Sequence, residues 1–238
     1  MSGIKMSISG KTVLALVPAR GGSKGVKKKN LRIVGGHTLI EFTLLAAKQS
    51  CYIDNIYLSS DDEKILAYGH AFGAKTIVRP LEYASDTATA IEVVKHFLTV
   101  IPDELKQQNP YIIYLQPTSP LRAANHIDEA LIKMIEQNSV TLVSVTELIE
   151  SPFKSFKLDS NNRLQSLFDE KLSNARRQDL PTVYIPNGAI YVFRVSDFVE
   201  HGGFPSNGSV PFIMNKLDSI DIDTEEDICR LEQILRDK

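Results

Sequence analysis

Residues 13–25 read VLALVPARGGSKG, and this stretch decides the fold. Its first part, residues 13–17, is a continuous apolar run that stops at Pro18 and a glycine cluster. A short run of this kind is typical of a parallel strand buried on both faces, and the glycines indicate a loop at its end. We expect a ligand at that loop, because open α/β sheets bind ligands at the carboxyl ends of their strands.

Outward from this strand, apolar runs and helical spacing alternate along the chain. Strands are predicted at 56–58, 76–78, 112–115, 141–145 and 189–193, and helices at 38–49, from 61 onward, at 88–100, at 127–136 and from Thr224 onward. The alternation predicts an α/β fold with a doubly wound, mostly parallel, Rossmann-like sheet. The apolar and acidic alternation at 219–223 (SIDID) is interpreted as a strand before the last helix.

The domain organisation follows from where this alternation breaks. We expect a disordered lead over 1–11 and an α/β domain formed by 12–146 and 184–238. Between them, residues 147–183 hold short apolar runs around the polar turn 159–162 (DSNN). That pattern indicates a turn-rich, β-rich small lobe inserted into the main domain.

Composition narrows the function classes. The 238 residues carry 27 Lys and Arg against 29 Asp and Glu, a formal charge of -2, which argues against a nucleic-acid partner. No apolar run approaches the roughly 18 residues of a membrane helix, and residues 1–10 lack the apolar core of a signal peptide. Two cysteines without metal-ligand or redox spacing fit a reducing compartment. We therefore expect a cytoplasmic protein with no membrane partner.

The loop after the first strand brings cations and glycines together. Arg20, Lys24 and the run 27–29 place five positive side chains within ten residues, among three glycines. Glycines let backbone NH groups approach an anion, so this loop is interpreted as a polyphosphate cradle. It matches neither GxGxxG nor a P-loop. The alternative is a solvated basic loop or a nuclear-import-like patch.

Two further segments carry polar side chains. Gln116 follows a predicted strand within 116–122 (QPTSPLR), which is either a rigid loop or a substrate contact. Asp221 and Asp223 would share one face of a strand, where paired carboxylates suit Mg²⁺, with Mn²⁺ as the alternative. Exposed acids, or a helix cap at Asp223, would leave the same pattern. A phosphate cradle and a metal pair together indicate nucleotidyl transfer from a nucleoside triphosphate.

Six ordered motifs extend this interpretation to a family. They are 16–30 (LVPARGGSKGVKKKN), 79–89 (RPLEYASDTAT), 115–122 (LQPTSPLR), 177–181 (RQDLP), 186–191 (PNGAIY) and 219–224 (SIDIDT). The chain resembles the CMP-sialic acid synthetases, or N-acylneuraminate cytidylyltransferases, including CMP-legionaminate synthetases. The resemblance implies a nucleotide-diphospho-sugar transferase type of fold. It also implies in-line attack by the 2-hydroxyl of a nine-carbon keto acid sugar on the α-phosphate of CTP, with release of pyrophosphate.

The resemblance also implies roles for particular residues. The expected CTP-binding residues are Ala19, Arg20, Ser23, Lys24, Asn30, Arg79, Ala88 and Thr89. The expected sugar-binding residues are Gln116, Lys154, Arg177, Tyr191 and Phe204, with Lys154 reached from a partner subunit and Arg177 on the sugar carboxylate. Lys29, Arg20 and Asp223 are expected to act in catalysis, and Asp221 and Asp223 to hold Mg²⁺. Asp223 is also the candidate base for the 2-hydroxyl.

In this family the insertion at 147–183 would be a dimerisation lobe, so the resemblance implies a homodimer with sites shared between subunits. Ile185 stands where relatives that use N-acetylneuraminate often have Arg, and the chain has no Trp, which weighs against pseudaminate. The expected product is therefore CMP-N-acetylneuraminate or CMP-N,N'-diacetyllegionaminate. The alternatives are a 3-deoxy-manno-octulosonate cytidylyltransferase, a sugar-1-phosphate nucleotidyltransferase, or a catalytically silent nucleotide-binding or scaffolding protein on the same fold.

Overall fold

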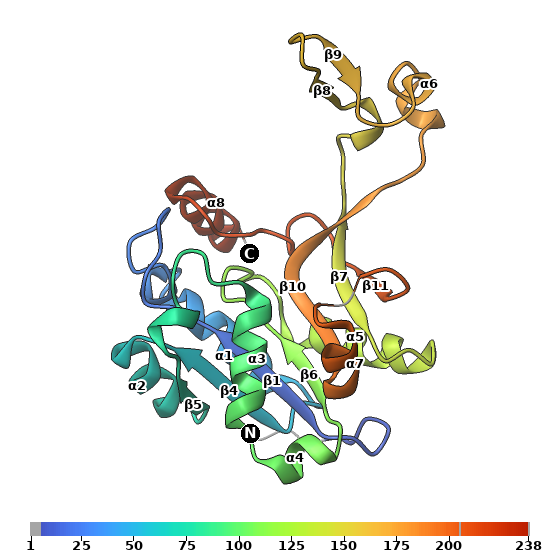
Figure 1. Cartoon of the computed structure of the whole chain (residues 1–238). Helices are drawn as coiled ribbons and strands as arrows, with labels where there is room; N and C mark the ends of the chain where they lie inside the picture. The colour runs from blue at the N-terminus through green and yellow to red at the C-terminus, as the bar shows by residue number, and fades with distance from the viewer. Residues whose placement is uncertain (1–5, 205, 238) are drawn as a thin grey trace.

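The computed structural model describes residues 6–204 and 206–237. Within them, seven strands form one sheet in the order β11-β7-β10-β6-β1-β4-β5, and two short hairpins lie outside it (Figure 1). The sheet strands are β1 (Val13–Pro18), β4 (Asn55–Ser60), β5 (Lys75–Val78), β6 (Tyr111–Tyr114), β7 (Leu142–Glu147), β10 (Tyr184–Arg194) and β11 (Val210–Ile213). β10 runs antiparallel to β6 and β7, and the other neighbours pair in parallel. The predicted doubly wound, mostly parallel sheet is confirmed.

The apolar run at residues 13–17 lies in the interior of this sheet. β1 pairs with β6 on one side and with β4 on the other, and its residues from Val13 to Val17 are fully buried. Alternate side chains enter two different cores: Val13, Ala15 and Val17 pack in one, and Leu14 and Leu16 in the other. Burial on both faces explains why the sequence shows a continuous apolar run rather than alternation.

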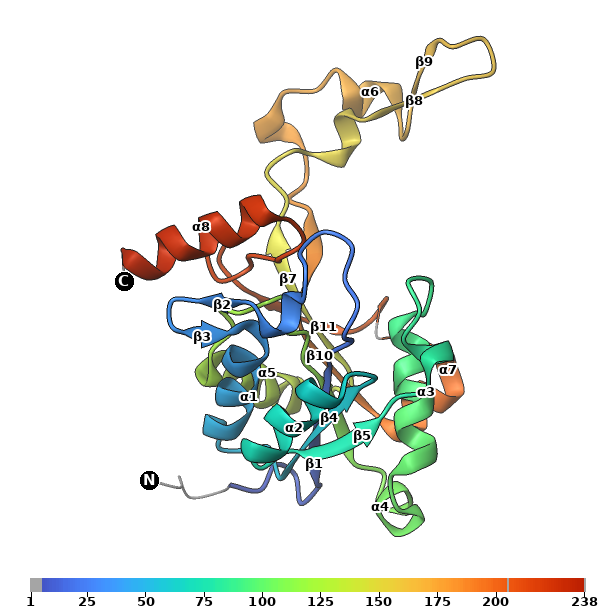
Figure 2. The ribbon, with the colours of Figure 1, turned by 90° about the vertical axis from the view of Figure 1, so that its left-hand side faces the viewer.

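Helices cover both faces of the sheet. The helices of the described residues are α1 (Leu39–Gln49), α2 (Glu63–Ala71), α3 (Ala90–Val100), α4 (Asp103–Gln107), α5 (Ala124–Glu136), α6 (Glu170–Ser173), α7 (Val195–His201) and α8 (Glu225–Arg236), of which α6 and α8 lie off the sheet. α1, α2 and α5 contribute to one core, and α3 and α7 to the other, on opposite sides of the sheet in Figure 2. None of the helices in the described part of the chain is long and apolar enough to cross a membrane.

α8 packs beside the first loop rather than on the sheet. Its buried Ile228 and Leu231 join Val26 and Ile222 in a third core, next to the hairpin of β2 (Ile33–Val34) and β3 (His37–Thr38). Thr224 caps this helix and Asp227 returns the bond, as the capping box in the sequence indicates. This core fixes the loop after β1, the glycine loop (residues 19–29), against the acidic segment that carries Asp221 and Asp223 (residues 219–223).

β7 and β10 leave the main body together and carry residues 148–183 away from it (Figure 1). This lobe holds a hairpin of β8 (Phe156–Leu158) and β9 (Leu164–Ser166), followed by α6. Within 148–186, all of which the structure describes, no residue is buried. The lobe therefore has no hydrophobic core of its own.

Two sequence-based expectations are corrected. Residues 219–223 are not a strand; in the described chain they have no ladder partner, and their one bond to the backbone of another segment runs from Ile222 N to the Thr118 carbonyl (2.9 Å). The expected disordered lead lies partly outside the described residues, at 1–5. Its remainder is ordered, because Ile8 is buried, bridges to Lys11 and joins the main core. Met6 and Ile8, among Ser, Gly and Lys, are too few to give a periodicity from which this could be predicted.

Candidate functional site

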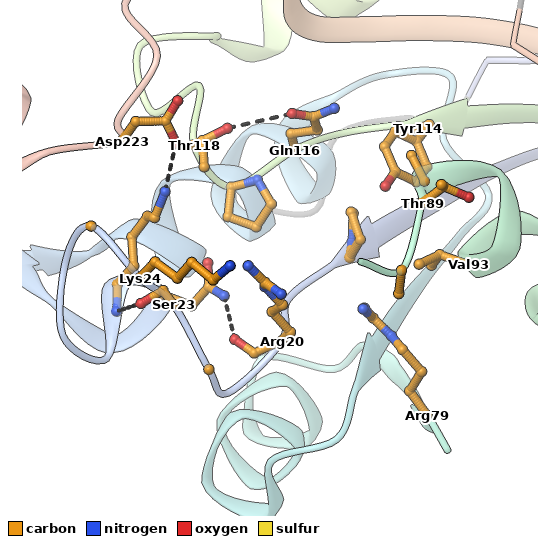
Figure 3. Close-up of a pocket in the computed structure, with 18 residues that line it drawn as sticks. Arg20, Ser23, Lys24, Arg79, Thr89, Val93, Tyr114, Gln116, Thr118 and Asp223 are labelled. Atoms are coloured by element: carbon orange, nitrogen blue, oxygen red, sulfur yellow. Dashed lines mark hydrogen bonds and ion pairs between the residues drawn. The ribbon is translucent and has the colours of Figure 1, made fainter. Parts of the chain in front are cut away.

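A cavity of about 330 Å³ lies at the carboxyl end of β1 and β6, where the sequence predicts a ligand. Four cationic side chains, Arg20, Lys24, Lys29 and Arg79, line it together with Asp223. Figure 3 shows Arg20 and Lys24 from the loop after β1, Arg79 from the segment after β5 and Asp223 from the segment before α8 lying around this cavity. The other lining residues are Pro18, Gly22, Ser23, Gly25, Asn30, Ala88, Thr89, Ala90, Val93, Tyr114, Gln116, Pro117 and Thr118.

The glycine loop is held in a defined shape. Asn30, which is buried, donates from Nδ2 to the Arg20 carbonyl at 2.8 Å, and the Ser23 hydroxyl bonds the Val26 carbonyl. Gly25 packs directly on the Asp223 backbone, where a Cβ would lie 1.9 Å from the Asp223 carbonyl oxygen. Only glycine permits this approach, which brings the glycine loop into contact with the acidic segment.

Exposed ion pairs hold two of the cations. Arg20 Nη1 lies 3.0 Å from Asp86 Oδ1, and Lys24 Nζ lies 3.3 Å from Asp86 Oδ2. Asp86 belongs to the segment that precedes α3, so these pairs connect the loop after β1 with that segment. Partly exposed pairs of this type contribute only about 0–1 kcal/mol, so both cations can exchange the carboxylate for another anion at little cost.

Lys29 and Asp223 meet on another wall. Lys29 Nζ is 2.8 Å from Asp223 Oδ1 and donates to the Ile222 carbonyl at 2.7 Å. The Lys29 ammonium group thus contacts both a carboxylate and a backbone carbonyl. The Lys29 side chain is 14% exposed and that of Asp223 is 71% exposed, so the carboxylate is open to solvent and ligand.

Asp221 lies close to this pair but lines a neighbouring cavity beneath the lobe, together with Lys216 and Arg230. Desolvation raises the pKa of Asp221, a hydrogen bond with Thr118 lowers it, and the negative charge of Asp223 raises it further. The two carboxylates therefore interact, although the extended segment directs them to different cavities.

Arg79 and the start of α3 form the opposite wall. Arg79 is 5% exposed, and its guanidinium donates to the Ser59 carbonyl at 2.6 Å and to the Ser59 hydroxyl at 3.1 Å. Burial lowers the pKa of Arg79. Thr89 caps α3 with Glu92, so Ala88 and Thr89 lie at the N-terminal end of this helix, which faces the cavity.

Most of the sequence-predicted nucleotide residues lie in this cavity. The exception among them is Ala19, which is fully buried in the core and does not line the cavity. Tyr191 and Phe204 lie behind the wall rather than on it, and their rings pack edge-on against Tyr114 at 6.4 and 4.9 Å between centroids. Within the single chain, Lys154 and Arg177 are in the lobe, away from the cavity (Figure 1).

Sequence reasoning missed two buried residues around Gln116. Tyr114 lines the cavity from the end of β6, and the period of two along a strand, which puts it on the face of Gln116, is the signal that indicates it. Arg122 is 1% exposed, beneath the loop. Its guanidinium donates to the Gln116 and Ala189 carbonyls, both at 3.0 Å, and to the Thr43 hydroxyl at 2.6 Å. Among the described residues it has no carboxylate partner, and burial lowers the pKa of Arg122 to about 9.

Known proteins resemble this chain over most of its length. The family model for cytidylyltransferases matches residues 14–202. An N-acylneuraminate cytidylyltransferase of Escherichia coli is 34% identical over 90% of this chain, which spans about half the length of that relative. A pseudaminic acid cytidylyltransferase of Campylobacter jejuni is 32% identical, covering 90% of this chain and 92% of the relative. A CMP-N,N'-diacetyllegionaminic acid synthase of Legionella pneumophila is 31% identical over 94% of this chain and 96% of its own.

Solved structures share the fold. A CMP:2-keto-3-deoxy-manno-octonic acid synthetase complexed with CTP superimposes with a TM-score of 0.67 at 16% identity, covering 95% of this chain and 99% of that one. A 4-diphosphocytidyl-2C-methyl-D-erythritol synthase from Anaerococcus prevotii gives 0.63 at 16% identity, over 96% and 98%. The match of the family model over most of the chain, with near full-length relatives above 30% identity, shows that this chain belongs to the cytidylyltransferase family.

Proposed function

We propose that this protein transfers CMP from CTP to the 2-hydroxyl of a free nonulosonic acid, a nine-carbon 2-keto acid sugar, and releases pyrophosphate. The observation that carries the proposal is the cavity in which Arg20, Lys24 and Lys29 face Arg79 and the start of α3, with Asp223 at its edge. Relatives named for sialic, pseudaminic and legionaminic acids support the acceptor class.

CTP fits this cavity by charge. The triphosphate would lie along the glycine loop, where Arg20 and Lys24 exchange Asp86 for phosphate oxygens. Lys29 would contact the leaving pyrophosphate and stabilise the charge that develops on it. The base and ribose would then lie toward Arg79, Ala88 and Thr89. Hydrogen-bonding groups there would favour a base whose edge carries the matching donors and acceptors.

The residues around Asp223 fit Mg²⁺. Asp223 and the Ile222 carbonyl offer oxygen donors on one wall, where the Lys29 ammonium group already contacts both, and Asp221 adds its carboxylate from the neighbouring cavity. No group of three or more His, Cys, Asp or Glu side chains that could hold a metal occurs among the described residues. One or two carboxylates plus substrate phosphates are what Mg²⁺ prefers, and Mn²⁺ is the alternative. When bound, the metal would neutralise phosphate charge during the transfer.

The chain's own residues account for the remaining steps. The 2-hydroxyl oxygen of the sugar forms a bond to the α-phosphorus as the bond from that phosphorus to the bridging oxygen of pyrophosphate breaks. Asp223, exposed at the cavity edge, accepts the hydroxyl proton. Positioning supplies most of the acceleration, because phosphoryl-type transfer asks little covalent chemistry of a protein.

A homodimer completes the acceptor site in this proposal. Lys154 and Arg177 lie in a coreless lobe, whose Leu158, Leu164 and Phe168 are 60%, 71% and 48% exposed. Apolar side chains in such a lobe are stabilised when a second copy covers them. The lobe of the partner subunit would then bring Lys154 to the acceptor site, and Arg177 would pair with the sugar carboxylate through two parallel hydrogen bonds. The same proposal places the protein in the cytosol, with CTP.

The direct test is pyrophosphate release from CTP with Mg²⁺, with N-acetylneuraminate, N,N'-diacetyllegionaminate, pseudaminate and 3-deoxy-manno-octulosonate in parallel. Release with one nonulosonate, and the CMP-sugar mass in the same reaction, would support the proposal and name the sugar. Chelation should abolish release, and Lys29→Ala should raise the KM for CTP. Release only with the eight-carbon acid would favour the octulosonate alternative, suggested by the fold neighbour. Silence with all acceptors, with CTP binding intact, would favour a non-catalytic protein.

The dimer is tested separately by light scattering of the purified chain. A dimer mass for the wild type, and a monomer mass for Leu164→Glu, are expected. Gln165→Glu is a matched control on the same hairpin, because Gln165 is exposed and its substitution adds the same single negative charge without removing an apolar side chain. A monomeric wild type would remove the shared-site part of the proposal.

A further inference from the structure

Tyr114 joins the nucleotide cavity to the aromatic side chains behind it. It is the last residue of β6, it is 3% exposed, and it lines the cavity two residues before Gln116. Its ring packs edge-on against both Tyr191 and Phe204, which in turn pack against each other at 5.1 Å. Among these three aromatic side chains, it alone reaches the cavity wall.

The Tyr114 hydroxyl has no hydrogen-bond partner among the described residues. The hydroxyl is not fully enclosed by protein, since the fully buried side-chain atoms without a partner do not include it. Figure 3 shows its oxygen on the side of the ring that faces the cavity. Buried tyrosine hydroxyls normally find a partner within the protein. This one is therefore available to a ligand. Burial raises the pKa of Tyr114, so the hydroxyl stays protonated at neutral pH and can both donate and accept.

The other walls of the cavity indicate which ligand this is. The cations Arg20, Lys24 and Lys29 occupy the loop side. Arg79 and the start of α3 lie next to Tyr114, since burial raises the pKa of Tyr114 and the charge of Arg79 lowers it in part. In-line displacement places the incoming hydroxyl opposite the leaving pyrophosphate, which leaves the wall of Gln116 and Tyr114 for the acceptor. This wall continues toward the acidic segment, since the charge of Asp221 contributes to raising the pKa of the adjacent Tyr191, after the larger effect of burial.

We propose that the Tyr114 hydroxyl hydrogen-bonds a polar substituent, a hydroxyl or an amide, of the acceptor sugar and so helps to select the acceptor. This inference rests on the proposed function. A buried hydroxyl that must be paired discriminates strongly, because an acceptor without the matching group leaves it unsatisfied in an apolar surround. The aromatic cluster fixes the ring, so the hydroxyl cannot turn away to pair elsewhere.

The test is Tyr114→Phe, which removes only the oxygen. We expect kcat/KM for the acceptor that the wild type prefers to fall about ten-fold, the usual scale for one lost hydrogen bond, and the KM for CTP to stay the same. Discrimination between that acceptor and the others in the panel should shrink by the same factor. Tyr57→Phe is the matched control: Tyr57 is 6% exposed in β4, packs edge-on against Phe97 in the same core, and does not line the cavity.

Three outcomes would overturn the inference. Unchanged acceptor kinetics in Tyr114→Phe would show that the hydroxyl contacts no acceptor. A raised KM for CTP, or lost discrimination against 2'-deoxy-CTP, would assign the hydroxyl to the nucleotide. An equal loss in Tyr57→Phe would show a general effect on the core. A wild type that turns over no nonulosonate would be a different failure, since the proposed function falls there and this inference with it.

Discussion

Gly25→Ala should uncouple the glycine loop from the acidic segment. The added Cβ would lie 1.9 Å from the Asp223 carbonyl oxygen, whereas such contacts are essentially never shorter than 3.0 Å. Loop and segment must therefore separate by about 1 Å or more. That movement displaces Asp223 relative to Lys29, now 2.8 Å away, and a misplacement of about 1 Å at a reacting centre costs about 10²-fold in rate.

The assay is pyrophosphate release with CTP and the preferred acceptor, alongside thermal unfolding. We expect kcat to fall about 10²-fold, while overpacking in this partly exposed loop costs only about 1–3 kcal/mol of stability. Gly22→Ala is the matched control, because in the described chain nothing lies within 4 Å of its Cβ position although Gly22 lines the same cavity. Wild-type turnover in Gly25→Ala, or an equal loss in Gly22→Ala, would refute the reasoning.

Three further substitutions test other parts of the site. Asp223→Asn should lower kcat by at least about 10²-fold, and near-wild-type turnover would remove Asp223 from the mechanism. Arg177→Ala should raise the KM for the acceptor about ten-fold and leave that for CTP unchanged, on the scale of a lost charged hydrogen bond; an unchanged acceptor KM would place the sugar carboxylate elsewhere. Arg122→Ala should lower the free energy of unfolding in urea by about 3 kcal/mol or more, because two carbonyls and the Thr43 hydroxyl lose their donor. A change below about 1 kcal/mol would show that water replaces the guanidinium.

The central part of the fold was predictable because its signals are local. β1 is buried on both faces and therefore appears as an uninterrupted apolar run, and the helices beside it keep their own period. The direction of β10 was not predictable in this way. Its buried residues look like those of any central strand, and only pairing with β6 and β7, which are distant in sequence, makes it antiparallel. The edge strand β11 was missed because it is short and contains Pro211.

The candidate site also has a part that local sequence signals predict and a part that they do not. The glycine loop and the segment 79–89 follow strands directly, so the topology alone brings Arg20, Lys24 and Arg79 together. The acidic pair is different: the alternation at 219–223 suggested one shared face, but without a ladder partner the backbone directs Asp221 and Asp223 to different cavities. Local spacing determines geometry only where hydrogen bonds hold the backbone in a regular element.

The absence of buried residues throughout 148–186 also determines which part of this molecule unfolds locally first. Without a core, the amide hydrogens of β8, β9 and α6 depend on very little local stability, so they should exchange with solvent long before those of β1. If a second copy covers the lobe, their protection becomes a function of protein concentration, whereas that of β1 does not. A hydrogen-exchange series in dilution would then report self-association one amide at a time.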